Sequence, residues 1–358
     1  MLDRYFAPDY AAARNIFLAA CREADVGVTH HAHPLSRQNA AELSLDVARI
    51  GPRAAQRLLI LQSGVHGPEL MCGSGCQVGL LREGVIGRLG EDTAVLLVHA
   101  VNPWGAAYGH RYNEDNVDLC RNFLDFDQPL PGNPAYEKLR GVVEDVAGCD
   151  GDLLMQRLRD AAQKAQIAPF VAPLMMGQYR HPRGFGYGGS APTWSNQVMT
   201  RILDEHAATA TRVAVIDFHS GLGDYGEGTV VVMHDGADLE RARRWFGSTL
   251  VAPREGSGPD AFFPVRGHCS DGFQRSLPRT ELTYVTLEFG TFSMERNFAA
   301  LLEDYCVSRQ DDPGCERVAA AYSEMLTTHN PDDATWRRKL WRRAVEVCEQ
   351  AIACLQRE

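Results

Sequence analysis

Short apolar runs alternate with helical patterns along most of the chain. The runs most typical of strands are 57–62, 94–101, 212–217, 229–233 and 283–289. Because these runs are almost continuously hydrophobic, they predict strands that are covered on both faces. The helical patterns lie at about 8–25, 69–83, 134–166, 196–209, 237–247, 295–305 and 314–327. Alternation of this kind predicts an α/β fold built on a sheet.

Two segments stand apart from this alternation. Residues 181–196 are rich in glycine and proline, which predicts a long loop of the kind that often carries function. Residues 335–356 predict a final helix with a basic first half. Its apolar face is expected to pack on the core through Trp341, Val345, Cys348 and Ile352. We expect a single domain over 1–358, with a C-terminal helical extension at about 331–358.

The composition limits the classes of function. Lys and Arg number 36 against 46 Asp and Glu, a formal charge of −10, which argues against binding to nucleic acid. Ten cysteines without a C-x-x-C pair favour reduced, buried thiols over a disulfide framework. The N-terminus does not resemble a signal peptide, and no window is apolar enough for a membrane span. We therefore expect a cytoplasmic protein, and its oligomeric state stays open.

A histidine and a glutamate stand three residues apart directly after the first predicted strand. The segment reads SGVHGPE and contains His66 and Glu69. Ligands of α/β proteins gather at the carboxyl ends of strands, and zinc accepts both imidazole nitrogen and carboxylate oxygen. By itself, such a pair also occurs by chance in many chains.

A second histidine, His219, ends another apolar run in the segment DFHSGLG. In isolation, a core histidine bonded to a backbone carbonyl would explain it. Together with His66 and Glu69, it makes a set of two histidines and one glutamate. Three protein ligands leave a fourth position open, which is typical of catalytic zinc sites and not of structural ones. These residues therefore predict a catalytic Zn²⁺ site.

Three further charged residues stand near the predicted strand ends. Arg111 and Arg121 follow the run 94–101 on a polar segment. They could bind an anion or stabilise an oxyanion, or they could be surface ion-pair partners. Glu288 lies inside an apolar run, where a carboxylate is costly unless it is paired or functional. It suits a general base beside a metal, with burial against an arginine as the alternative.

The order of these motifs is itself informative. HGPE, then NPWG and VDLCRNF, then DFHSGLG and LEFGT resembles the zinc carboxypeptidase superfamily, which also includes succinylglutamate desuccinylase and aspartoacylase. The motifs span 63–291. The resemblance is closest to a carboxypeptidase-like bacterial branch catalogued as a domain of unknown function. It implies a three-layer α/β/α fold around a central mixed, mainly parallel sheet, with zinc at the strand ends.

The resemblance also implies a role for each metal-site residue. His66, Glu69 and His219 match the zinc ligands of the family. Asp118 matches the carboxylate that orients the first histidine, in keeping with the general rule for metal-bound imidazoles.

The remaining roles concern catalysis and substrate binding. By resemblance, Arg111 polarises the scissile carbonyl, Arg121 grips a substrate carboxylate and Glu288 is the catalytic base. The family's Asp-Leu-Asn-Arg reads Asp-Leu-Cys-Arg here, so Cys120 replaces a carboxylate-binding asparagine. The family's flexible active-site tyrosine has three candidates without a supporting motif. These are Tyr187, Tyr225 and Tyr284.

The resemblance implies a zinc metallohydrolase that cleaves an amide bond near a free carboxylate, through a zinc-activated water with Glu288 as general base. The substrate would be a peptide, as for a carboxypeptidase. The alternative is a small molecule, as for an N-acyl amino-acid amidohydrolase of the aspartoacylase or desuccinylase kind. A catalytically silent zinc-binding module is a third interpretation, and the presence of Glu288 and Arg111 argues against it.

Overall fold

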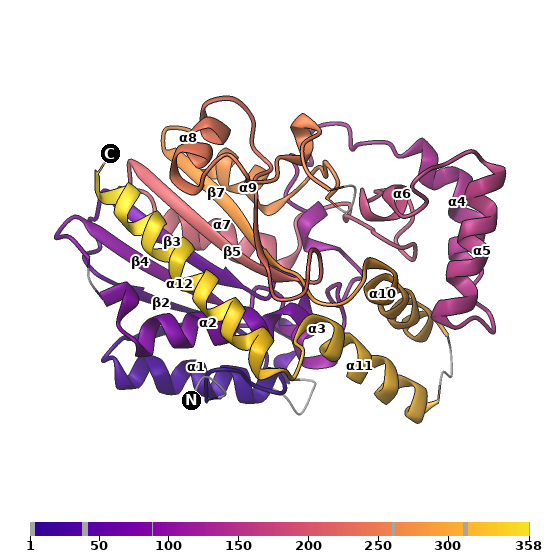
Figure 1. Ribbon diagram of the computed structural model, residues 1–358, viewed down its shortest axis with the longest axis horizontal. Helices are drawn as coiled ribbons and strands as arrows, with labels where there is room; N and C mark the ends of the chain where they lie inside the picture. Colours follow the sequence, from indigo (N-terminus) through magenta and orange to yellow (C-terminus); the bar gives the residue numbers. More distant parts are fainter. Residues whose placement is uncertain (1–3, 38–41, 88, 260–261, 311–313, 358) are drawn as a thin grey trace.

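The centre of the molecule is a mixed, mostly parallel sheet between layers of helices (Figure 1). The computed structural model describes residues 4–37, 42–87, 89–259, 262–310 and 314–357. Within these ranges the strands are β1 (Val28–Ala32), β2 (Ser44–Ile50), β3 (Arg57–Ser63), β4 (Thr93–His99), β5 (Arg212–Ser220), β6 (Gly228–Val231) and β7 (Glu281–Phe289). Their order is β1-β2-β4-β3-β5-β7-β6. The central strands β4, β3, β5 and β7 are parallel, and β2 and β6 pair with them antiparallel.

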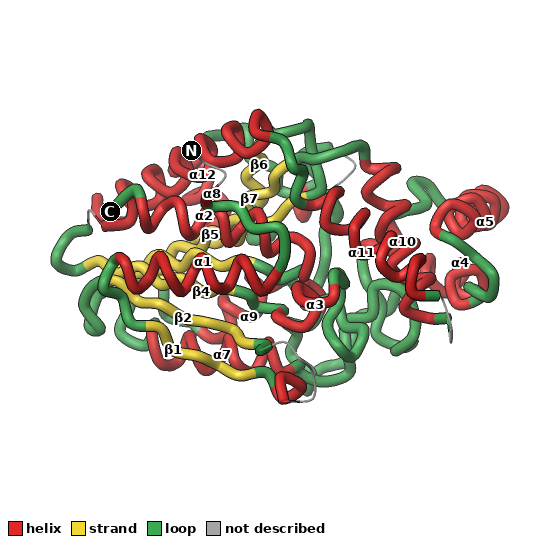
Figure 2. Tube along the Cα trace, turned by 90° about the horizontal axis from the view of Figure 1, so that it is seen from below, coloured by secondary structure: helices red, strands yellow, loops and turns green. Residues whose placement is uncertain are grey.

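Helices cover both faces of this sheet (Figure 2). They are α1 (Tyr10–Glu23), α2 (Leu70–Arg82), α3 (Pro103–Tyr108), α4 (Pro134–Glu144), α5 (Gly151–Lys164), α6 (Ala172–Met175), α7 (Trp194–His206), α8 (Gly236–Phe246), α9 (Cys269–Ser276), α10 (Met294–Arg309), α11 (Cys315–His329) and α12 (Ala334–Arg357). Side chains of α1, α2, α8 and α12 pack on one face, and those of α7 and α9 pack on the other. The predicted three-layer α/β/α fold is confirmed.

The period of two along each strand explains why the central strands are apolar throughout. In β3, Leu59 and Leu61 join the core under α2 and α12, whereas Leu58 and Ile60 join the core under α7 and α9. A strand buried on both faces needs an apolar residue at every position. All five strands predicted from apolar runs are present, with ends that differ by a few residues.

The edge strand β1 and its neighbour β2 were not predicted. β1 reads VTHHA and is partly exposed at every residue, so it lacks an apolar run. The helical pattern over 134–166 is also two helices, because Asp150 caps a new helix and its side chain accepts from Leu153 N.

The buried face of the last helix, α12, differs in part from the expected one. Trp336, Leu340 and Ala344 of α12 are fully buried, whereas Trp341 and Val345 are only partly buried beside the core. The two predicted residues Cys348 and Ile352 are buried. Since α12 shares the core under β3 and β5, we continue to propose one domain over 1–358.

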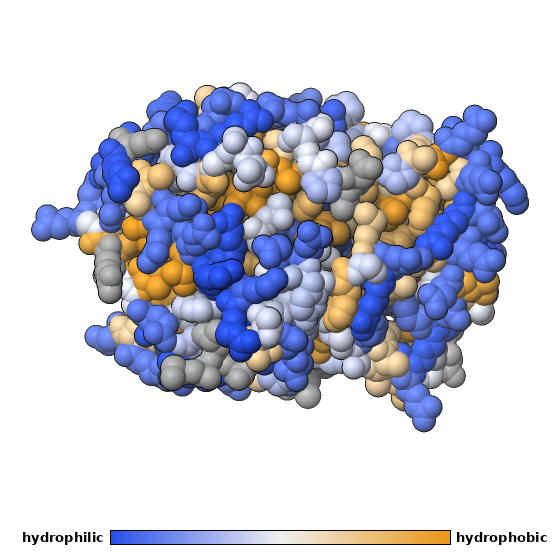
Figure 3. Space-filling model, in the orientation of Figure 1, coloured by the Kyte–Doolittle hydropathy of each residue, from blue (hydrophilic) through white to orange (hydrophobic). Residues whose placement is uncertain are grey.

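A group of helices lies to the right of the sheet in Figure 1 and contains α4, α5, α10 and α11. These helices share a hydrophobic core of their own, which includes Tyr136, Leu158, Phe298 and Met325. The outer surface in the same view is mostly hydrophilic, with apolar residues showing in smaller areas (Figure 3). No helix in the described ranges has a stretch long and apolar enough to cross a membrane.

Candidate metal centre and active site

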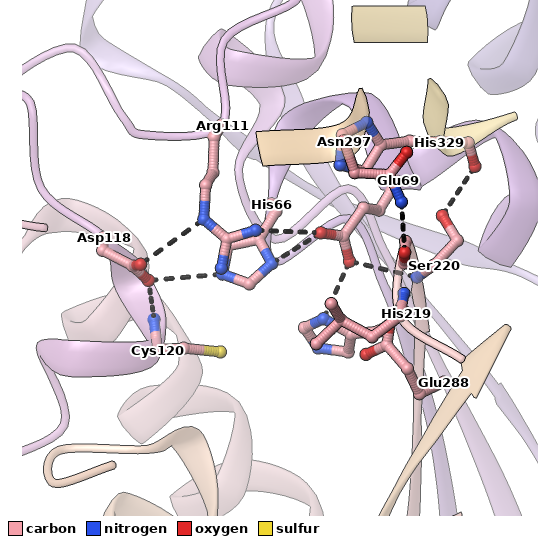
Figure 4. A network of polar contacts seen from close by, with 12 residues as sticks. His66, Glu69, Arg111, Asp118, Cys120, His219, Ser220, Glu288, Asn297 and His329 are labelled. Carbon is pink, nitrogen blue, oxygen red and sulfur yellow. Dashed lines mark hydrogen bonds and ion pairs between the residues drawn. The ribbon is translucent and has the colours of Figure 1, made fainter. Parts of the chain in front are cut away.

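The three predicted metal ligands meet at the carboxyl ends of β3 and β5 (Figure 4). His66 follows β3, Glu69 ends the 3-10 turn Gly67–Glu69, and His219 lies near the end of β5. His66 Nδ1 is 2.8 Å from Glu69 Oε1, and His219 Nδ1 is 2.8 Å from Glu69 Oε2. All three side chains are buried. The sequence reading therefore identified three side chains that do converge.

A glycine allows the turn that carries these ligands to sit tightly against α3. A Cβ atom on Gly67 would lie 2.1 Å from the carbonyl carbon of Gly105, much too close for any other residue. This contact joins the turn after β3 to the helix after β4, so that residues from both loops face one site.

A carboxylate faces the far nitrogen of each imidazole. His66 Nε2 is 3.2 Å from Asp118 Oδ1, and His219 Nε2 is 2.9 Å from Asp217 Oδ2. Carboxylates in this position fix the ring orientation of metal-binding histidines. As a result, both Nδ1 atoms are turned toward Glu69, on the side where a shared cation would bind.

Two buried hydrogen bonds, one leading to the next, hold the Asp217 carboxylate in place. The Tyr284 hydroxyl donates to Asp217 Oδ2 at 2.7 Å, and Gln62 Nε2 donates to the Tyr284 oxygen at 2.8 Å. The three side chains come from the adjacent strands β3, β5 and β7. Sequence reasoning missed Asp217 and Gln62. Asp217 precedes His219 by two residues and so shares its face of the strand, a spacing that could have revealed it.

The side chains fit a divalent cation. Burial and Arg111 lower the pKa of His66, but the carboxylates of Glu69 and Asp118 outweigh them and raise it to about 10. In the metal-free chain, protons on the imidazoles thus supply the positive charge that these buried carboxylates require. A zinc ion would replace those protons, because metal binding takes neutral imidazole. Two imidazole nitrogens and a carboxylate are donors that zinc accepts.

A second group of potential ligands lies beside the first. His66, Asp118 and Cys120 also place ligand atoms within 4.8 Å of one another. However, Arg111 Nε is 3.5 Å from Asp118, and Arg121 Nη1 is 4.0 Å from it. These guanidinium groups already neutralise Asp118, so we favour the first group as the metal centre.

The predicted base, Glu288, lies directly beside His219. The two residues are partners in the pairing of β5 with β7, and Glu288 Oε1 accepts a hydrogen bond from Leu222 N at 3.1 Å. Burial and the negative charge of Glu69 raise the pKa of Glu288 to about 7. A carboxylate with a near-neutral pKa can both take and return a proton at physiological pH.

The two predicted arginines differ in their surroundings. Arg111 Nη1 donates to Glu69 Oε1 at 3.3 Å, so its guanidinium lies beside the candidate metal centre. Arg121 donates from Nε, at 3.0 Å, and from Nη2 to the Met175 carbonyl, and from Nη1 to the Cys120 carbonyl at 2.9 Å. Both arginines line the same cavity. Arg121 therefore anchors the backbone as well as facing the place where a substrate would bind.

The cavity that these residues share measures about 80 Å³. Its polar side is formed by His66, Arg111, Cys120, Arg121, His219 and Glu288. The other side is apolar and contains Val231, Met233, Phe262, Phe263 and Val265. His268 also lines the cavity, and no motif had singled it out. Tyr187 and Tyr225 do not line it, and Tyr284 lies behind His219 in the chain of hydrogen bonds.

The chain is similar to two solved structures, and the first of them supports this architecture. Carboxypeptidase A from Helicoverpa armigera is 13% identical, with 95% of this chain and 73% of that chain covered and a TM-score of 0.50. Bovine thrombin-activatable fibrinolysis inhibitor is 14% identical, with 89% and 96% covered and a TM-score of 0.49. No curated protein matches the chain.

The protein thus has a carboxypeptidase-like α/β fold, with a cluster of two histidines and a glutamate at the strand ends. Residues 6–343 match the family described as "Protein of unknown function (DUF2817)". The chain belongs to this family, which confirms the expected carboxypeptidase-like branch of unknown function.

Proposed function

We propose that the protein is a zinc-dependent hydrolase that cleaves an amide bond near a free carboxylate. One observation carries this proposal. Nδ1 of His66 and Nδ1 of His219 each face one oxygen of Glu69, and Glu288 is the strand neighbour of His219. This arrangement combines a three-ligand metal site with a base that has an unusually high pKa.

A bound zinc ion would act as a Lewis acid that polarises the substrate carbonyl and makes a water molecule more acidic. Glu288, with its near-neutral pKa, would take a proton from a water molecule in the cavity and return it to the leaving amine. Arg111 donates to the oxygen on which negative charge builds up, an interaction whose loss typically slows catalysis by roughly 10²–10³-fold. Arg121 uses its remaining N–H groups to hold the substrate carboxylate.

Two substrate classes remain within this chemistry. One is the carboxyl end of a peptide, and the other is an N-acyl amino acid. Cys120 in place of an amide side chain favours the N-acyl amino acid. We propose zinc as the metal and an N-acyl amino acid as the first substrate to be tried.

The proposal is tested by a screen of N-acyl amino acids and short peptides, each as free acid and as amide. Arg121→Ala is expected to lower kcat/KM for free acids at least ~10-fold more than for amides. A guanidinium can donate two parallel hydrogen bonds to a carboxylate, whereas an amide group cannot accept both. The amides serve as the internal control for disturbance of the loop. Equal losses on both substrates would show that Arg121 only supports the backbone at Met175 and Cys120.

A second prediction concerns the hydrogen bonds behind His219. Tyr284→Phe removes the hydroxyl that donates to Asp217, and Asp217→Asn removes the charge that faces His219 Nε2. Each is expected to weaken zinc binding by roughly 10–100-fold, the usual contribution of such partners. Tyr305→Phe is the matched control, since its buried hydroxyl donates to the Arg183 carbonyl. Competition with a chelator measures the zinc Kd, and a wild-type value in both variants contradicts this role.

A further inference from the structure

Two buried cysteines lie in contact at the edge of the active-site cavity. Cys120 Sγ is 4.0 Å from Cys269 Sγ, although the residues are 149 positions apart in the sequence. Cys120 belongs to the 3-10 turn Leu119–Arg121, and Cys269 is the first residue of α9. Both are free thiols. The sulfurs are in contact and need to approach by about 2 Å to reach the ~2.05 Å of a disulfide.

The two thiols differ in how accessible they are from the active-site cavity. Cys120 lines the cavity together with His66 and Glu288, and Cys269 is not among the residues that line it. Both side chains are almost fully buried from the outer surface. A small reagent that enters the cavity therefore meets the sulfur of Cys120 first, with Cys269 behind it.

Several polar side chains share the cavity with Cys120. His268 Nδ1 accepts a hydrogen bond from Ser270 N at 3.2 Å. His268 lines the same cavity as Cys120. The guanidinium groups of Arg111 and Arg121 line the same cavity. The Cys120 sulfur therefore lies among polar side chains of the cavity, 4.0 Å from the second sulfur.

We propose that Cys120 and Cys269 form a peroxide-reactive thiol pair, a covalent modification site inside the active-site cavity. The Cys120 sulfur attacks one oxygen of hydrogen peroxide, the O–O bond breaks, and a sulfenic acid and one water result. The Cys269 sulfur then attacks the sulfenic sulfur, the S–O bond breaks, and a disulfide and a second water form. Two thiols thus give two electrons to one peroxide.

A disulfide at Cys120 would affect the candidate metal centre through the backbone N–H of Cys120. Cys120 N donates to Asp118 Oδ1 at 3.0 Å, and this oxygen is also 3.2 Å from His66 Nε2. Pulling Cys120 toward α9 disturbs the carboxylate that orients His66. This consequence rests on the proposed zinc function, and the oxidised protein is expected to bind zinc at least ~10-fold more weakly.

The thiol pair is tested on the reduced, full-length chain with graded hydrogen peroxide and a non-reducing peptide map. The expected product is a cross-link between the peptides that contain Cys120 and Cys269, reversed by dithiothreitol. Cys315→Ser, which removes an exposed thiol, should leave the cross-link intact. Cys269→Ser should abolish it and leave a sulfenic acid on Cys120 that dimedone traps. Oxidation of Cys315 while the pair stays reduced would overturn the proposal, and the wild-type map alone can show this.

The effect on the metal centre is measured separately. The zinc Kd of the reduced and the cross-linked protein is compared by competition with a chelator. An unchanged Kd in fully cross-linked protein overturns the coupling to His66. A reduced protein that binds no zinc contradicts the proposed function instead, and the peptide map still decides whether the thiol pair exists.

Discussion

Glu288→Gln is expected to lower turnover by roughly 10²–10⁴-fold while the fold and the zinc content stay unchanged. Glutamine has nearly the same shape, and its side-chain oxygen can still accept from Leu222 N. It cannot take a proton from water or return one to a leaving amine. The loss is expected in kcat more than in KM, because a base acts in the transition state and contributes little to substrate binding.

The measurement is steady-state kinetics on the best substrate of the screen, with zinc content determined on the same preparations. Glu227→Gln is a suitable control, because this glutamate is exposed and pairs with Lys339. Its activity should equal that of the wild type. Wild-type turnover in Glu288→Gln would remove Glu288 from the mechanism and leave it as a buried partner of His219 and Leu222 N.

The central strands and the candidate ligands were readable from the sequence for a physical reason. β3, β5 and β7 are covered on both faces, so their apolar runs stand out, and polar residues such as His219 and Glu288 are conspicuous where these runs end or are interrupted. The glycines around His66 mark the sharp turn after β3. The order of these motifs then indicated the carboxypeptidase-like fold, which the structure confirms.

Other parts of the site depend on contacts between distant segments, which periodicity does not encode. The carbonyl that Arg121 binds belongs to Met175, and the sulfur that touches Cys120 belongs to Cys269. Neither partner stands in a recognisable motif. The edge strand β1 was missed for a different reason, since its half-exposed residues lack the apolar run on which the prediction depended. Asp217 was detectable in principle from its spacing to His219.

His219→Ala is expected to abolish stoichiometric zinc binding. The wild type, purified without chelator, should contain about one zinc per chain, bound by His66, Glu69 and His219 with one open position. Loss of one of three protein ligands leaves Glu69 Oε2 without its imidazole partner. The zinc Kd should therefore rise by far more than the roughly 10–100-fold that an outer carboxylate contributes.

Two measurements check this loss, and one matched variant controls for the removal of a buried histidine. Elemental analysis gives the metal content, and thermal unfolding shows whether added zinc raises the Tm, as binding to the folded state requires. His99→Ala is the control, because His99 is buried beside Ser74 and stacks on Phe17. It should lose stability through the cavity it leaves but still contain one zinc. Full zinc content in His219→Ala, with an unchanged response of Tm to zinc, would mean that the metal binds elsewhere and that His219 is a core histidine held by Asp217.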